Sequence, residues 1–366
     1  MFRKIGLLIV CCMVSGLVAG QAPAVCSNYP AARDLGRYVA VQAASALDEN
    51  WKAGECIVLS NAGYARPDGR STQGCLDGVA EITRSSVGRS TLITLQSRFD
   101  QPLWFAFYDR SSGRCAYYEL EAELAGKALA GHQDLDKTLF SRSDMARIDA
   151  EFLFAEPEAF KAKCRQGLFG QNVFRVVTVA NAADQDCPNH VLKAMQVHDH
   201  YCPGVTSGIM LAAFVQEHIL NDSAQAPCFV LSLNPWCKED ALTTLLNATP
   251  GKRAYGVVYP GEGEVKSWPK PMHTVSTAVF VQKEKDNAWH GWLLSFDFDQ
   301  ARSMQDLPAF DFPVLDKLAS DLWFLDKLDS PERFVSVVKE VELENGVSPK
   351  ALLRPGSNPV RMLAEM

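Results

Sequence analysis

The two halves of this chain resemble each other, and a tandem duplication constrains the fold more than any other feature of the sequence. The short apolar segment GECIVLS in the first half returns as APCFVLS in the second. Asp77 precedes Gly88 by eleven residues, and Asp240 precedes Gly251 by the same spacing. Because a repeated sequence folds into repeated units, we expect two similar domains in tandem.

Each copy is predicted to be an α+β domain with helices packed on a mainly antiparallel sheet. A turn-forming segment at 109–113 between two apolar runs predicts a hairpin in the first copy, and 277–282 with 289–296 predict its counterpart. The polar segment 125–150 is expected to be a loosely helical connection. Two copies are too few for a solenoid, so we expect a pseudo-symmetric pair packed face to face.

The domain boundaries follow from where the similarity ends. The segment FLFAEPEAF at 152–160 resembles FLDKLDSPERF at 324–334, and the Pro-Glu pair in each predicts a helix start. We therefore place the first copy at 25–183 and the second at 184–366.

The first 24 residues are predicted to be a secretory signal peptide. Arg3 and Lys4 form a short positive region, 5–18 is apolar, and small residues fill 19–24. The apolar run is too short for a comfortable bilayer span, so we expect no stable membrane span after processing. The sequence therefore predicts an exported protein, periplasmic or extracellular.

The net charge limits the kinds of partner that the protein can have, and the cysteine content bears on its redox state after export. A net charge of −7 and a pI of about 5.6 argue against nucleic acid as the main partner. Two of the eleven cysteines lie in the predicted signal peptide, so nine remain. Export permits disulfides, and an odd count leaves at least one thiol free, bound to metal or paired between chains.

Two histidines and a cysteine lie close together in the segment VHDHYCPG. His198, His200 and Cys202 alternate with other residues, so on an extended segment all three point the same way. The following Pro-Gly is expected to turn the backbone into an apolar helix. Cys237, at a later helix start, is the fourth candidate ligand.

This donor set predicts a transition-metal site. Imidazole and thiolate in a tetrahedral array suit zinc best, and nickel, cobalt, copper or iron would also bind. Asp199 and Asp240 are expected to orient an imidazole ligand without binding the metal themselves. Trp236 is expected to line a pocket, and Lys252 to lie at the edge of the cleft.

The segment HDHYCPG resembles the signature of the FmdE family, which is named after a component of formylmethanofuran dehydrogenase. The later segments CKEDA, from Cys237, and TPGK, ending at Lys252, resemble two further family motifs in the same order. Val197 replaces the usual aromatic residue, and Asp199 replaces a glycine between the histidines. The resemblance implies a metal at this segment and does not fix the ion.

The first copy is interpreted as a degenerate FmdE-like domain. It reads CSNYP before its first helix and has no histidine there. It does retain Cys26 and Cys75 near the places of Cys202 and Cys237. Our hypothesis is that Cys26 and Cys75 form a disulfide where the second copy holds a metal.

Two classes of function fit these features, and the sequence leaves open whether the protein is an enzyme. It is predicted to bind or deliver a metal ion, or a small metal-containing ligand, outside the cytoplasm. As an enzyme it would be a hydrolase with metal-activated water, a hydrolase with Cys202 as nucleophile and a histidine as base, or a thiol oxidoreductase using Cys202 and Cys237. The resemblance and the duplication are both compatible with a homodimer.

Overall fold

A computed structural model describes residues 27–47, 51–220, 226–283 and 288–366. The predicted signal peptide at 1–24 and Cys26 lie outside the described residues. Among the described helices, none combines the length and apolar character that a membrane span requires.

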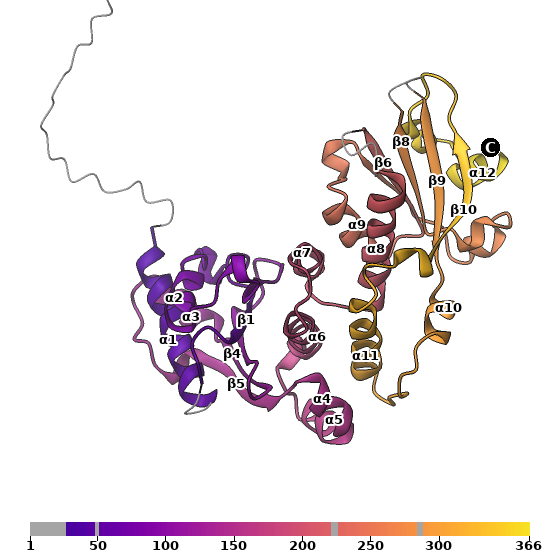
Figure 1. Cartoon of the computed structure of the whole chain (residues 1–366). Coiled ribbons are helices and arrows are strands. Elements are labelled where there is room, and N and C mark those ends of the chain that lie inside the picture. Colours follow the sequence, from indigo (N-terminus) through magenta and orange to yellow (C-terminus); the bar gives the residue numbers. More distant parts are fainter. Residues whose placement is uncertain (1–26, 48–50, 221–225, 284–287) are drawn as a thin grey trace, which may run out of the picture.

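The first half forms a five-stranded sheet with three helices on one face (Figure 1). Its elements are α1 (Tyr29–Leu47), β1 (Cys56–Ser60), α2 (Gly74–Thr83), β2 (Leu92–Thr94), β3 (Trp104–Asp109), β4 (Arg114–Leu120), α3 (Ala122–Leu129) and β5 (Phe140–Arg147). Four helices then lead to the second half: α4 (Ala150–Ala155), α5 (Pro157–Arg165), α6 (Val173–Asp184) and α7 (Asn189–His198).

The second half forms another five-stranded sheet. Its elements are α8 (Pro203–Phe214), β6 (Cys228–Leu233), α9 (Lys238–Leu245), β7 (Tyr255–Val258), β8 (Thr277–Gln282), β9 (Trp289–Phe296), α10 (Phe298–Ser303), α11 (Pro313–Leu325), β10 (Val335–Glu342) and α12 (Pro359–Glu365).

The two sheets have the same topology. The strand orders are β2-β1-β3-β4-β5 in the first and, starting from the β7 edge, β7-β6-β8-β9-β10 in the second. In each sheet the first pair is parallel and the other pairs are antiparallel. The predicted hairpin of β3 and β4 and the predicted strands β8 and β9 are confirmed, as is the α+β class.

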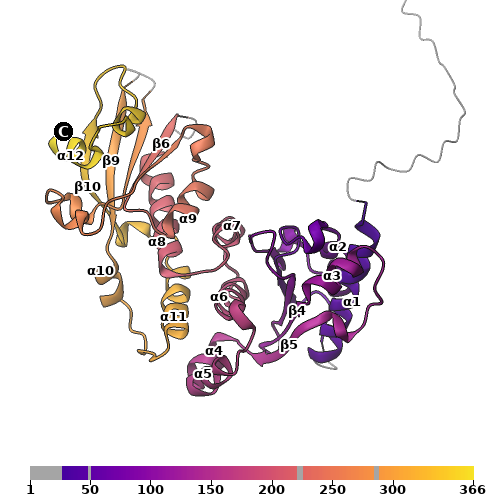
Figure 2. The same cartoon turned by 180° about the vertical axis from the view of Figure 1, so that it is seen from behind.

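The two halves stack in the same sense rather than face to face. Helices α1 and α2 lie on the outer face of the first sheet, whereas their counterparts α8 and α9 lie on the inner face of the second (Figures 1 and 2). Helices α6 and α7 fill the space between. The prediction of face-to-face packing is therefore wrong, because α6 covers the second face of the first sheet before the chain reaches α8.

One apolar cluster crosses the boundary between the halves. It contains the inner face of the first sheet, most of α6 and α7, the start of α8 and the buried side of α11. Phe154 and Phe310 stack at 5.2 Å, and Phe160 meets Phe312 edge-on at 5.9 Å. The metal-type residues of the sequence lie at the edge of this core.

Two further sequence interpretations are wrong. Segment 125–150 contains β5, an edge strand whose outer side chains are exposed, which explains its polar composition. The similar segments 152–160 and 324–334 are not equivalent, since the first follows the fifth strand of its sheet and the second precedes it. Pro-Glu begins a helical segment in both, so the shared residues reflect local helix initiation.

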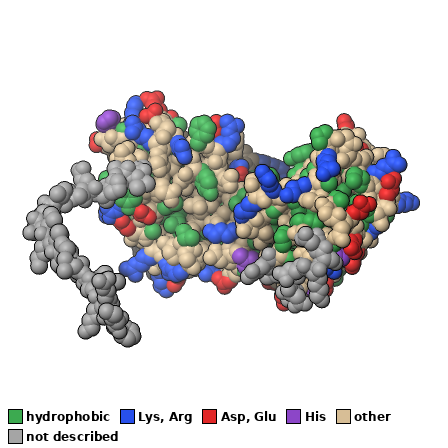
Figure 3. All heavy atoms as spheres, turned by 90° about the horizontal axis from the view of Figure 1, so that it is seen from above, with side chains coloured by type: hydrophobic (Ala, Val, Ile, Leu, Met, Phe, Trp, Pro, Cys, Tyr) green, Lys and Arg blue, Asp and Glu red, His purple; other side chains and the backbone are tan. Residues whose placement is uncertain are grey.

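The surface carries charges of both signs. On the face shown in Figure 3, basic and acidic side chains are interspersed over both halves.

Candidate metal centre

Three helix ends meet at the candidate centre. His198 is the last residue of α7, Cys202 is the N-cap of α8, and Cys237 is the N-cap of α9. One ligand atom from each of the three lies within 4.8 Å of the other two. Cys202 is buried, and the other two side chains are partly exposed.

The backbone between His198 and Cys202 is not the extended segment that the sequence predicted. Asp199 has φ of 70° and ends α7 in the left-handed conformation, and Cys202 is the extended residue that begins α8. Pro203 and Gly204 are the first residues of α8 rather than a separate turn. Proline suits this position because its missing N–H would have no helical partner there.

A left-handed position explains the glycine that is usual between the histidines in the family. Glycine adopts such a φ without a steric penalty, and aspartate is among the few other residues that tolerate it. The carboxylate of Asp199 is held here by two neighbours: Arg175 Nη2 donates to Oδ2 at 2.8 Å, and His200 Nδ1 lies 2.7 Å from Oδ1. These bonds stabilise the turn.

Tight packing of α8 on α9 brings the two thiols together. A Cβ on Gly204 would lie 2.7 Å from Cys237 Cβ and 3.2 Å from its Sγ. A Cβ on Gly208 would collide with the carbonyl of Lys238. Both glycines are therefore required for the approach of the helices.

Glu239 fixes the start of α9. Its Oε1 accepts from Ser232 Oγ at 2.5 Å and pairs with Lys238 Nζ at 2.8 Å, and its Oε2 accepts from the backbone N–H of Trp236. Ser232 belongs to β6. The position of Cys237 is therefore set by β6, an inner strand of the second sheet.

Asp240 selects the nitrogen that His198 presents to the thiols. His198 Nδ1 lies 2.6 Å from Asp240 Oδ2, and since a carboxylate accepts, Nδ1 carries the proton. The other nitrogen, Nε2, lies 3.9 Å from Cys202 Sγ. This carboxylate–histidine arrangement is typical of metal ligands, because it fixes the tautomer and raises the basicity of the free nitrogen.

The three groups also shift one another's pKa. Burial opposes the charged form of His198, but hydrogen bonds with Asp240 and Cys237 outweigh it and raise the pKa to about 9. A hydrogen bond with Cys202, joined by His198, lowers the pKa of Cys237 against the effect of burial. The same hydrogen bond and burial raise the pKa of Cys202. The three side chains thus favour the charged forms of Cys237 and His198 and the neutral form of Cys202.

His200 lies beside the cluster and outside it. Its ring is 4.3 Å from that of His198 and 5.1 Å from that of Phe174, centroid to centroid. Its Nδ1 faces Asp199, which leaves Nε2 as the nitrogen available to a ligand. The structure therefore brings together three of the four predicted ligands, and the assignment of all four stays a prediction.

The other predicted residues have separate places. Asp240 contacts His198, and Asp199 contacts His200. Trp236 is 58% exposed and lines a hollow of about 860 Å³ with Lys238. Lys252 lies in the turn after α9, where its Nζ donates to the carbonyl of Asn247, and it does not join the cluster.

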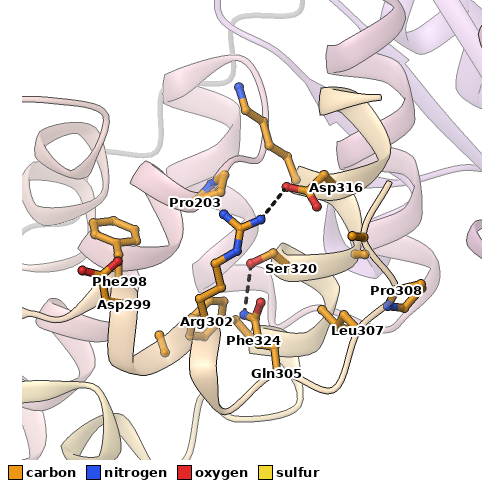
Figure 4. Close-up of a pocket in the computed structure, with 14 residues that line it drawn as sticks. Pro203, Phe298, Asp299, Arg302, Gln305, Leu307, Pro308, Asp316, Ser320 and Phe324 are labelled. Atoms are coloured by element: carbon orange, nitrogen blue, oxygen red, sulfur yellow. Dashed lines mark hydrogen bonds and ion pairs between the residues drawn. The ribbon is translucent and has the colours of Figure 1, made fainter. Parts of the chain in front are cut away.

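A second hollow, of about 300 Å³, borders the centre at Pro203 (Figure 4). Arg302 of α10 extends across it and pairs with Asp316 of α11 at 3.4 Å. Gln305 Nε2 donates to Ser320 Oγ at 3.0 Å beside this pair. The hollow is thus bridged by polar contacts that α10 and the residues directly after it make with α11.

Sequence reasoning missed Asp321, which anchors the start of α8. The carboxyl of Asp321 on α11 is fully buried, Thr206 Oγ1 donates to its Oδ1 at 2.7 Å, and Tyr201 Oη donates to its backbone carbonyl at 3.0 Å. Burial raises the pKa of Asp321 well above the usual range of a carboxyl group. Its place in an apolar helix pattern gave no signal of this role.

The first half lacks the equivalent thiols. Gly36 lies against the carbonyl of Cys75 in the same way as Gly208 lies against the carbonyl of Lys238, so Cys75 is the counterpart of Lys238. The residue before it, Gly74, is therefore the counterpart of Cys237. Counting back from the same glycines, Pro30 stands in the place of Cys202. Cys75 therefore lies one residue beyond the site position, and the predicted disulfide with Cys26 involves a residue outside the described part of the chain.

The fold and the cluster define an α+β protein with a thiolate–imidazole centre of the kind that holds a transition metal. The donor set fits such an ion, because soft thiolates and a pre-oriented imidazole converge within one ligand sphere. Residues 197–307 match the family model FmdE, described as "Molybdenum formylmethanofuran dehydrogenase operon", so the second half contains an FmdE family domain. Comparison with curated proteins finds no match to this chain.

Proposed function

We propose that the second half binds one transition-metal ion through His198, Cys202 and Cys237, with zinc the best fit. The observation that carries the proposal is the convergence of the three ligand atoms together with the contact of His198 Nδ1 with Asp240. Such a centre needs a fourth ligand, and His200 Nε2, water or an external donor would supply it.

The role that we propose is the binding or delivery of a metal ion or of a small metal-containing ligand. The hollow of about 860 Å³ supports this role, since its lining includes Trp236 and Lys238, the chain neighbours of Cys237, and it offers room for a ligand near the centre. Export belongs to the proposal and rests on the sequence of residues 1–24. The first half, with Pro30 and Gly74 at the site positions, would act as scaffold and as a degenerate copy of the same domain.

The alternative is a metal-dependent hydrolase. A three-residue centre with an open position would lower the pKa of a bound water and make it a nucleophile. The observation that favours this alternative is the partial exposure of His198 and Cys237, which leaves the cluster accessible from solvent.

Elemental analysis of the purified full chain tests the proposal. We expect about one equivalent of a transition metal, lost in Cys202→Ser/Cys237→Ser and in His198→Ala. Cys164→Ser and His132→Ala are matched controls away from the cluster, and both should retain the metal. Metal-free wild-type protein after reloading with zinc, or equal metal in the double variant, would contradict the proposal.

Activity of the loaded protein separates the two roles. A carrier should release its metal to a chelator or accept an added ligand without turnover. Hydrolysis of an ester substrate that requires both the metal and an intact cluster would instead establish the enzyme.

A further inference from the structure

A third hollow, of about 740 Å³, lies in the first half at the ends of its two parallel strands. Asn61 follows β1 and Leu95 follows β2, and both line it. The hollow beside Trp236 has the same place in the second half, where Leu233 ends β6 and Asn234 follows it. The carboxyl ends of parallel strands are where open α/β sheets bind ligands.

Arginine side chains give this hollow its chemistry. Arg142 of β5 uses Nη1 to donate to the carbonyl of Gly167 at 2.7 Å, and the same atom lies 3.5 Å from Asp144 Oδ2. Its Nε and Nη2 have no protein partner among the described residues. They lie against Gly170, where a Cβ would be 3.2 Å from Nε, so the glycine leaves space for the guanidinium.

The start of α6 adds positive potential on the same side. Arg175 lines the hollow and holds Asn172 Oδ1 at 3.3 Å and Asp199 Oδ2 at 2.8 Å. Asn172 is the N-cap of the twelve-residue α6, and its side chain does not cap the helix. The first turn of a helix carries a partial positive charge.

The negative groups of the hollow are already engaged. Glu119 accepts from Tyr117 Oη at 2.9 Å, and Asp199 is shared by Arg175 and His200. Of the charged residues that line the hollow, Arg98, Arg142 and Arg175 outnumber these two acids. Arg98 is itself paired with Asp100 and Arg175 with Asp199, so the positive group that this polar space offers to a ligand is the Nε–Nη2 edge of Arg142.

We propose that this hollow binds a small molecule with an oxyanion group, a carboxylate or a phosphate, through the free edge of Arg142. A guanidinium edge with two adjacent donors matches two oxygens of either group. The volume accommodates a molecule larger than the oxyanion alone. Arg142 lies outside the matched family segment, and the hollow reaches the metal centre only at its edge, where Asp199 contacts His200.

Calorimetric titration of the full chain with succinate and, separately, with inorganic phosphate at low salt tests this site. We expect saturable binding of at least one probe, and which one binds identifies the oxyanion. Arg142→Gln should weaken it about tenfold or more, because a charge-assisted bond is lost. Arg142→Lys should keep the positive charge but lose the pair of adjacent N–H donors, so it should weaken binding of the probe less than Arg142→Gln does.

Arg110→Gln is the matched control. Arg110 is 37% exposed against 35% for Arg142, and it also pairs with a carboxylate, Asp184, but outside this hollow. It should leave binding unchanged, and circular dichroism should show that all variants are folded. Failure of both probes to bind at millimolar concentration, or equal binding by wild type and folded Arg142→Gln, would overturn the proposal.

Discussion

At the scale of single residues, the centre depends on side chains that touch its ligands. Asp240 fixes the tautomer of His198, and its counterpart in the first half, Asp77, accepts instead from Tyr29 Oη at 2.7 Å. The sequence allowed Asp240 to be predicted, because the duplication and the motif around Cys237 both pointed to it. The sequence could not show that Asp199 and Asp240 serve different histidines.

Removing the carboxylate of Asp240 should lower the metal affinity while the three ligands stay in place. We expect Asp240→Asn to lower metal affinity about 10- to 100-fold, because the histidine loses the partner that orients it. Competition with a chromogenic chelator measures the affinity. Asp77→Asn removes the equivalent carboxylate from the first half and should change nothing. Equal losses in both variants would contradict this role.

The buried carboxyl of Asp321 should make stability depend on pH. Its pKa is raised in the folded state, so its contribution to stability is fully present below the ordinary carboxyl pKa of about 3.9 and is lost as pH rises above it. We expect Asp321→Asn to unfold at higher denaturant concentration than wild type at neutral pH, with a smaller difference near pH 4. Urea unfolding across this range measures the effect, and a variant less stable at neutral pH would refute it.

At the scale of elements, the ligands come from helix ends rather than from a strand. Alternation in VHDHYCPG predicted one face of an extended segment, and it failed because a left-handed residue ends α7 between the histidines. The substitution of Asp199 for a usual glycine was the available signal. His200 consequently turns toward Asp199, and Cys202 returns to His198.

Helices α8 and α9 approach each other so closely that position 208 should require glycine. We expect Gly208→Ala to destabilise the fold by about 1–3 kcal/mol, because its Cβ would collide with the backbone of Lys238. The Gly208→Ala substitution should also lower the metal affinity, since Cys237 is the N-cap of α9. Gly251→Ala, whose nearest neighbour would be 4.0 Å away, is the control and should be neutral within about 0.5 kcal/mol. Denaturant unfolding measures the loss of stability, and chelator competition measures the loss of metal affinity. A Gly208→Ala variant as stable as Gly251→Ala would contradict the requirement.

At the scale of the whole molecule, the repeated topology was predictable and the stacking was not. The duplication predicts two similar sheets because matched segments recur at matched spacing, and the sheets do share one strand order. The stacking depends on which face α6 and α7 cover, and α6 is apolar enough to suit several faces. The way the two halves stack is therefore set by the packing of the core that they share.

That shared core predicts cooperative unfolding. Because one apolar cluster joins the first sheet, α6, α7, α8 and α11, we expect both halves to unfold in one transition. Calorimetry should give a ratio of calorimetric to van't Hoff enthalpy of about 1. Two resolved transitions, with only the later one shifted by added zinc, would show that the halves are independent.

X-ray absorption spectroscopy of the zinc-loaded full chain measures the ligands of the metal directly. We expect two sulfur neighbours at about 2.3 Å and a nitrogen at about 2.0–2.1 Å, with one further light atom completing a tetrahedron. The sulfur signal should fall by half in Cys237→Ser. A shell of nitrogen and oxygen alone, unchanged by that substitution, would contradict a centre built from His198, Cys202 and Cys237.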